Sequence, residues 1–106
     1  MEVAWTQHAL DALEEVFHFG SRYSQDRAVD YVDQIIDFCD ALSQLPHKFP
    51  ACPELPHPDD VYRSAMFDRR YRIIYGIAEA DDKVYVLDVF HTSRNPDQIR
   101  RLRDVD

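Results

Sequence analysis

The stretch "YRIIYGIAEADDKVYVLDVFH", Tyr71 to His91, decides the fold class of this chain. From Tyr71 to Ile77 the residues alternate with a period of two, which is typical of a β-strand. The polar segment "AEADDK" then predicts a turn. The following segment "VYVLDVFH" is apolar on both faces, with Val84, Val86 and Phe90 expected on one side and Tyr85, Leu87 and Val89 on the other. Such a strand lies at the centre of a sheet that is covered on both faces.

Further strands and two helices are predicted outside this hairpin. Arg63 to Phe67 should form a third strand, and "MEVAW" at the start can add an edge strand. Apolar residues recur at helical spacing from Thr6 to Phe19 and again from Ser24 to Leu45. Thr6 and Ser24 are predicted N-caps, and Gly20 is predicted to end the first helix.

Five prolines crowd into the segment from Pro46 to Pro58, which predicts an extended surface loop. The sequence therefore predicts an α+β domain in which an N-terminal helix hairpin packs on one face of a small antiparallel sheet of three or four strands. The cationic cluster described below is expected on the side of the sheet that the hairpin leaves uncovered.

Length and composition limit the class of protein. The chain has 106 residues, of which 45% are hydrophobic, so we expect a single domain over residues 1–106. No apolar run is long enough to span a membrane, and the N-terminus lacks the order of a signal peptide, which predicts a cytoplasmic protein. Cys39 and Cys52 have no C-x-x-C spacing and are expected to be separate thiols.

The histidines raise the possibility of a metal site. His8, His18, His47 and His57, together with Cys52, match no common spacing of zinc ligands. We therefore expect no metal and no cofactor.

Charge is distributed unevenly along the chain. The net charge is −8, and the segment from Met1 to Val61 carries twelve acidic residues against three basic ones, or −9. From Tyr62 onward nine basic residues face eight acidic ones, or +1, with most arginines in this half. We expect the acidic helices to be solvated and the arginines to gather on another surface.

A cationic cluster is predicted at one end of the sheet. Antiparallel pairing should bring Arg72 close to His91 and Arg94, where guanidinium groups and an imidazole can hold a phosphate or a carboxylate. A second interpretation is open at this point. Arg72 can pair with Asp68 or Asp88, while His91 caps the strand by a hydrogen bond.

The order of these segments resembles a known family. Two helices, a proline-bearing loop, "VYRSAMF", "YRIIYGI", an acidic turn and "VYVLDVFHTSRNP" are similar to the RelE/ParE superfamily of bacterial toxins, also known as plasmid stabilisation proteins. The similarity extends from Trp5 to about Arg101. It implies a toxin that arrests growth as part of a type II toxin–antitoxin system.

The resemblance leaves two activities to choose between. RelE-like members cleave ribosome-bound mRNA, and in such an enzyme Arg72, His91 and Arg94 would be the catalytic residues. That branch commonly uses a C-terminal tyrosine, and this sequence has no tyrosine after Tyr85. A net charge of −8 also disfavours binding to the ribosome, because the phosphates of its RNA repel an acidic protein. The ending formed by His91, Arg94, Asn95 and Pro96 resembles the ParE-like branch, whose members poison DNA gyrase.

The favoured interpretation is therefore a ParE-like toxin that inhibits DNA gyrase by protein contact. Its predicted target-binding residues are Arg63, Arg72, His91 and Arg94. An inactive binding module of the same fold is a further alternative. We expect no membrane partner and no sequence-specific DNA binding by this chain alone.

The resemblance also implies a cognate antitoxin whose disordered segment folds on an exposed apolar groove of the toxin. The residues predicted to line this groove are Phe67, Ile74, Val86 and Phe90. The acidic helices favour a docking segment that carries basic residues. Solubility alone is the alternative explanation of those acidic residues.

Overall fold

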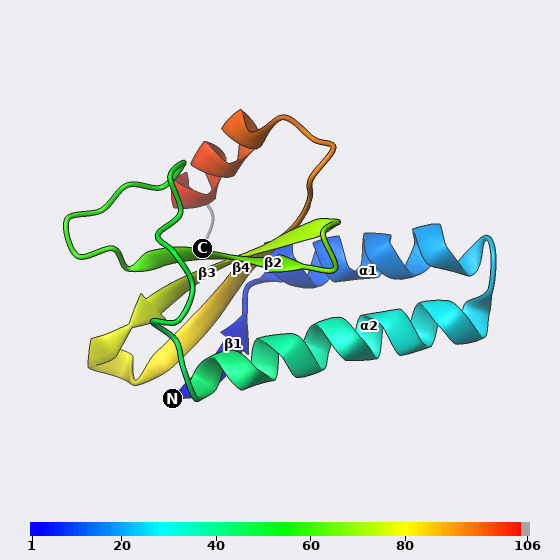
Figure 1. The fold of residues 1–106 in the computed structure, drawn as a ribbon, viewed down its shortest axis with the longest axis horizontal. Helices are drawn as coiled ribbons and strands as arrows, with labels where there is room; N and C mark the ends of the chain where they lie inside the picture. The colour runs from blue at the N-terminus through cyan, green and yellow to red at the C-terminus, as the bar shows by residue number, and fades with distance from the viewer. Residues whose placement is uncertain (105–106) are drawn as a thin grey trace.

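The computed structural model describes residues 1 to 104 and has the predicted α+β architecture (Figure 1). Its helices and strands are β1 (Glu2–Trp5), α1 (Gln7–Ser21), α2 (Gln25–Asp40), β2 (Tyr62–Phe67), β3 (Tyr71–Ala78) and β4 (Lys83–His91). Three 3₁₀ helices, η1 (Ala41–Ser43), η2 (Glu79–Asp81) and η3 (Pro96–Asp104), join or follow them.

The four strands form a mixed sheet in the order β1-β4-β3-β2. The strands β2, β3 and β4 are antiparallel as expected, but β1 pairs in parallel with β4. The prediction of an antiparallel sheet was therefore wrong for the edge strand. Alternation within a short segment marks it as a strand, but the direction of its pairing depends on where the two intervening helices return the chain.

The helix hairpin begins at the predicted caps. Thr6 Oγ1 accepts a hydrogen bond from the amide of Ala9 at 3.1 Å, and Ser24 Oγ accepts one from Arg27. Gly20 does not end α1, which continues to Ser21. A Cβ at Gly20 would lie 3.2 Å from Ala28 Cβ, so this glycine allows the two helices to approach closely.

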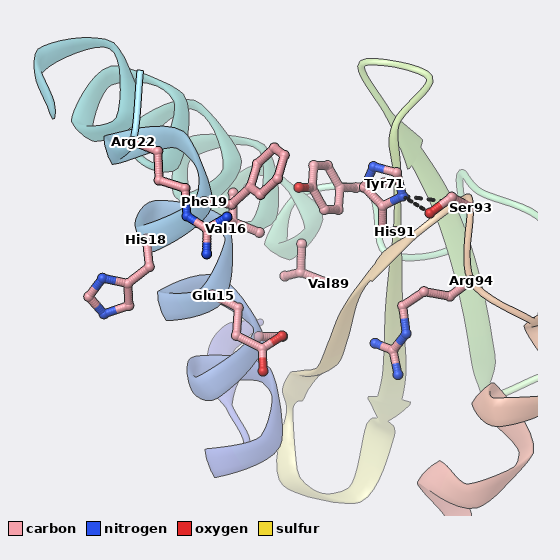
Figure 2. A pocket seen from close by; sticks show the side chains of 11 residues that line it. Glu15, Val16, His18, Phe19, Arg22, Tyr71, Val89, His91, Ser93 and Arg94 are labelled. Carbon is pink, nitrogen blue, oxygen red and sulfur yellow. Dashed lines mark hydrogen bonds between the residues drawn. The ribbon is translucent and has the colours of Figure 1, made fainter. Parts of the chain in front are cut away.

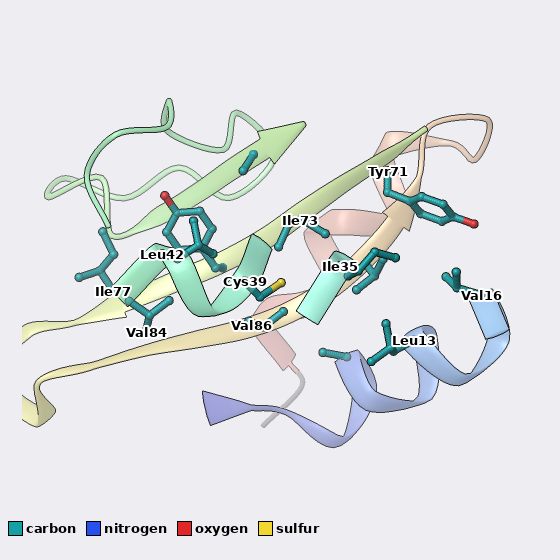
Figure 3. Close-up of a cluster of buried hydrophobic side chains, with 14 residues drawn as sticks. Leu13, Val16, Ile35, Cys39, Leu42, Tyr71, Ile73, Ile77, Val84 and Val86 are labelled. Carbon is teal, nitrogen blue, oxygen red and sulfur yellow. The ribbon is translucent and has the colours of Figure 1, made fainter. Parts of the chain in front are cut away.

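The main core lies between the hairpin and one face of the sheet (Figure 3). Ile35 and Cys39 of α2 are fully buried there against Ile73, Val84 and Val86. The hairpin is longer than the sheet, and its tip projects beyond the ends of the strands (Figure 1). The projecting part is what creates the concave surface described below.

The second face of the sheet is covered as well, which corrects the expectation of an uncovered face. Part of the proline-rich loop and η3 lie across it and bury a second cluster, consisting of Cys52, Leu55, Ile74, Phe90, Ile99 and Leu102. The loop is thus anchored rather than wholly at the surface. Cys39 and Cys52 are buried in separate clusters as free thiols.

A β-bulge in β4 changes which residues face the helices. Ile74 pairs with Asp88, but the next residue, Tyr75, pairs with Val86, so Leu87 is an extra residue. Val86 and Val89 consequently both face the main core, whereas strict alternation placed them on opposite sides. Phe90 turns to the second face. This bulge determines where the predicted site residues lie.

Candidate functional site

A groove lies between the hairpin tip and the ends of β3 and β4. It consists of two adjoining cavities of about 580 and 490 Å³, which we call the strand-end cavity and the hairpin-tip cavity. Both are lined by Val16, Phe19, Tyr71 and His91. Figure 2 shows these side chains facing one another across the strand-end cavity, two from α1 and two from the sheet.

The floor of the groove is apolar and aromatic. Tyr71 and His91 are directly paired across β3 and β4, and their rings meet edge to face with centroids 5.0 Å apart. Burial raises the pKa of Tyr71, so its phenol stays neutral at physiological pH. Phe19 remains 59% exposed on the helix side, and an exposed ring of this size above an apolar floor is typical of a contact surface.

His91 is held in one orientation. Its Nδ1 accepts a hydrogen bond from the Ser93 amide at 3.0 Å and lies 2.7 Å from Ser93 Oγ (Figure 2). Because Nδ1 accepts, a neutral ring carries its proton on Nε2. The Nε2 atom has no hydrogen-bond partner among residues 1–104 and can donate to a bound group.

The rim of the groove is cationic. Arg22 and Arg94 border the strand-end cavity, and Arg27 and Arg70 border the hairpin-tip cavity. Glu15 is the single carboxylate that lines either cavity within the described residues. His91 and Arg94, two of the predicted target-binding residues, are therefore together in this groove.

Arg72 lies elsewhere, which corrects the predicted cluster. Its Nη2 and Nη1 atoms donate to the two carboxylate oxygens of Glu54 at 2.7 and 3.1 Å, and its Nε donates to Ser64. Both charged side chains are about 85% buried, with 16% and 15% exposed. The hydrogen bonds from Arg72 hold the pKa of Glu54 below its usual range, and those to Glu54 raise the pKa of Arg72.

The bulge explains this separation. Arg72 pairs with Phe90 across the ladder and shares its face, whereas His91 pairs with Tyr71 on the helix face. The prediction that Arg72 pairs with a nearby carboxylate was right in kind, but the partner is Glu54 rather than Asp68 or Asp88. A cluster of Arg72 with His91 is therefore excluded by the geometry of the strands.

Arg63 also has an internal role. Its guanidinium donates to the backbone carbonyls of Phe49 at 2.8 Å and Asp60 at 2.9 Å. These bonds fasten both ends of the proline-rich loop to β2. Arg63 thus anchors the loop beside the main core, where Phe49 packs, whereas Arg72 anchors it on the second face through Glu54.

The predicted apolar antitoxin groove is not present at the residues named for it. Ile74, Val86 and Phe90 are at most 1% exposed, and Phe67 is half-buried against Tyr31 and Phe38. The prediction was wrong because both faces of the sheet are already covered. These residues form the core in place of an open surface.

No metal centre is formed by the described residues. Within residues 1–104 no three His, Cys, Asp or Glu side chains are placed to share a metal ion. In the same range, no helix combines the length and apolar character needed to cross a membrane.

The sequence from residue 3 to residue 96 matches the family described as the ParE toxin of type II toxin–antitoxin system, parDE. The chain belongs to the ParE toxin family. No curated protein matches this ParE-family chain.

Solved structures share the fold of this ParE-family chain. One is a chain of the chromosomal ParDE TA system from P. aeruginosa, 17% identical, with a TM-score of 0.68 over 86% of this chain and 95% of that chain. Another is the YoeB/ParE toxin from Agrobacterium tumefaciens, 21% identical, with a TM-score of 0.57 over 86% of this chain and 98% of that chain. At these identities the likeness concerns the fold.

Sequence reasoning missed the helix side of the groove. Phe19 was placed at the end of a helical segment and Tyr71 in a strand, and Arg22 was only one of the three basic residues counted before Tyr62. The available signal was the pair of large aromatic residues, Phe19 and Tyr23, placed around the turn between the helices. Residues in such a turn have little protein to pack against, and Tyr23 is 82% exposed.

Proposed function

We propose that this ParE-family chain inhibits DNA gyrase by protein contact and that a cognate antitoxin neutralises it. The single observation that favours inhibition by protein contact rather than by RNA cleavage is the pairing of Arg72 with Glu54. An endonuclease would need this guanidinium at the scissile phosphate. Here its charge is neutralised by Glu54 and its donors are directed inward.

The groove supports the proposal that a protein is the target. It joins two cavities of several hundred cubic ångströms and combines exposed aromatic rings with arginines, the residue types that dominate protein–protein contacts. His91 and Arg94 are the two predicted target-binding residues that reach it. We therefore assign the gyrase contact to the groove and its rim.

The antitoxin is proposed to cover the same groove, in place of the buried sheet residues named from the sequence. Masking the contact surface would be sufficient for neutralisation. A gyrase inhibitor acts in the cytoplasm, which is the location that the proposal implies.

Purified protein is expected to inhibit DNA supercoiling by gyrase and to leave ribosome-bound mRNA intact. Arg94→Glu should weaken the inhibition by about tenfold or more, because it reverses a charge on the rim of the proposed contact surface. The matched control is Arg100→Glu, which reverses an exposed arginine outside the groove.

Cleavage of mRNA on the ribosome with unaffected gyrase would refute the proposal in favour of an endonuclease. A folded protein that affects neither gyrase nor growth would be an inactive binding module. Equal losses in the Arg94 and Arg100 variants would show that the contact lies elsewhere.

A further inference from the structure

A small polar cavity lies beside the second core cluster, where the start of α1, the end of β4 and η3 come together. Its volume is about 180 Å³. Sites for drug-sized ligands are larger, at roughly 300–1,000 Å³, so this cavity suits an ion or a very small molecule. The polar side chains in its wall are His8, Asp88, Arg94, Gln98 and Arg101.

Asp88 is a buried charged residue in the wall of this cavity. Its side chain is 5% exposed, and its Oδ1 atom has no hydrogen-bond partner in the part of the chain that the structure describes. Its Oδ2 atom lies 3.4 Å from Nε2 of His8, which is largely exposed. Burying a carboxyl group without a full set of partners is costly. A ligand in the cavity that bonds to this group would offset the cost.

Two arginines line the same cavity, Arg94 from the loop after β4 and Arg101 from η3. The guanidinium group of Arg94 is held in place, because its Cζ lies 5.1 Å from the centroid of the Phe90 ring and its Nη2 donates to Gln98 Oε1 at 2.6 Å. Neither arginine lies within 4.0 Å of a carboxylate among the side chains that the structure describes. Both therefore keep donors for a bound group.

The charges around the cavity restrict the kind of ligand. The titratable and charged groups that surround Asp88 are His8 on α1, Arg94 after β4 and Arg101 on η3. Two guanidinium groups outnumber one carboxyl group, which favours an anion. An ionised Asp88 repels an anion unless a proton lies between the two. Burial raises the pKa of Asp88, which makes such a shared proton easier to hold.

We propose that this cavity binds a tetrahedral oxyanion that carries a proton, as hydrogen phosphate does. The P–OH group donates to the carboxylate of Asp88, and the other oxygens accept hydrogen bonds from Arg94 and Arg101. If the proton resides on Asp88, the carboxyl group donates to a phosphate oxygen instead, and the same atoms are joined. A free phosphate ion and the end of a phosphomonoester share this chemistry. The proposal is independent of the cellular target of the toxin.

Titration calorimetry of the full chain with inorganic phosphate and with sulfate tests the shared proton. Near neutral pH phosphate keeps a proton and sulfate has none, so at equal ionic strength phosphate should bind at least about tenfold more tightly. Amide shifts induced by phosphate should centre on Asp88 and Gln98. Equal binding of the two anions, no binding of phosphate, or shifts that centre elsewhere would each overturn the proposal.

Asp88→Asn tests the role of the carboxyl group, because it removes the charge and keeps the shape of the side chain. The amide donates to either anion without needing a proton, so sulfate should bind the variant within about twofold of phosphate. A variant that still prefers phosphate as strongly as wild type does would show that Asp88 does not select the ligand.

Arg101→Gln tests the cationic wall without altering the groove, which Arg94 also borders. It should weaken phosphate binding by about fivefold or more, through loss of a charge-assisted hydrogen bond. The matched control is Arg100→Gln, an exposed arginine of the same η3 that lies outside the cavity, and it should change binding by less than about twofold. Equal losses in the two variants would refute the assignment of Arg101.

Phenyl phosphate distinguishes the two sources of the ligand. The comparison is made near pH 6, where about half of a phosphomonoester keeps its proton. Binding of phenyl phosphate would support the site and show that it accepts the end of a larger ester. Binding of inorganic phosphate alone would support the site and identify the free ion as its ligand, whereas binding of neither would overturn the proposal.

Discussion

Glu54→Ala tests whether Arg72 is a structural residue. The substitution leaves the guanidinium of Arg72, which is 16% exposed, without its carboxylate partner and removes hydrogen bonds of 2.7 and 3.1 Å. Breaking a fully buried pair costs roughly 3–5 kcal/mol. Because both side chains keep some contact with water, we expect a loss of about 2–3 kcal/mol in the free energy of unfolding.

Urea unfolding followed by circular dichroism measures this loss in the free energy of unfolding. In thermal unfolding, a loss of this size corresponds to a fall in Tm of roughly 10–20 °C for a domain of this size. The matched control is Asp97→Ala. Its carboxylate lies 3.7 Å from Arg100 Nε in an exposed pair, so it should cost less than about 0.5 kcal/mol. A double-mutant cycle with Arg72→Ala should give a coupling energy of about 1–3 kcal/mol.

The same pair predicts a pH dependence. The folded state holds the pKa of Glu54 below its unfolded value, so the stabilisation is complete above the unfolded pKa and is lost as pH falls through the folded pKa. The difference between wild type and Glu54→Gln should therefore shrink in acid. If Glu54→Ala costs no more than Asp97→Ala, Arg72 is not held by Glu54, and its assignment as an internal residue is wrong.

Three further substitutions test other features of the fold by urea unfolding. Arg69→Gly should stabilise the protein by about 1 kcal/mol, because Arg69 has φ 57° in the β2–β3 turn; destabilisation would contradict that backbone geometry. Thr6→Ala should cost about 1–2 kcal/mol, because Thr6 caps α1 and also donates to the Val86 carbonyl; a neutral result would mean that neither bond matters. Burial raises the pKa of Asp88 despite its neighbour His8, so the ionised form destabilises the folded state. The Asp88→Asn variant should therefore become more stable than wild type, by about 1 kcal/mol, as pH rises through the folded pKa of Asp88. A stability advantage of the variant that is largest in acid would refute this direction of the pH dependence.

The sequence was sufficient to predict the type and order of the two α-helices and the four strands. The alternation from Tyr71 to Ile77 and the helical stripes are local patterns that repeat over several residues, and the caps Thr6 and Ser24 act within one helical turn. The resemblance of the ordered segments to the toxin family was confirmed for the same reason, because it depends on order and spacing along the chain.

The tertiary structure decided which side chains share a surface. One extra residue, Leu87, reverses the faces of Val89, Phe90 and His91, and period-two reasoning has no means of detecting an inserted residue in a strand that is apolar on both sides. Local sequence patterns likewise do not predict contacts between distant segments. Examples are the pair of Glu54 and Arg72 and the four arginines around the groove. Strand register and helix projection bring those residues together, and both are set by packing of the whole chain.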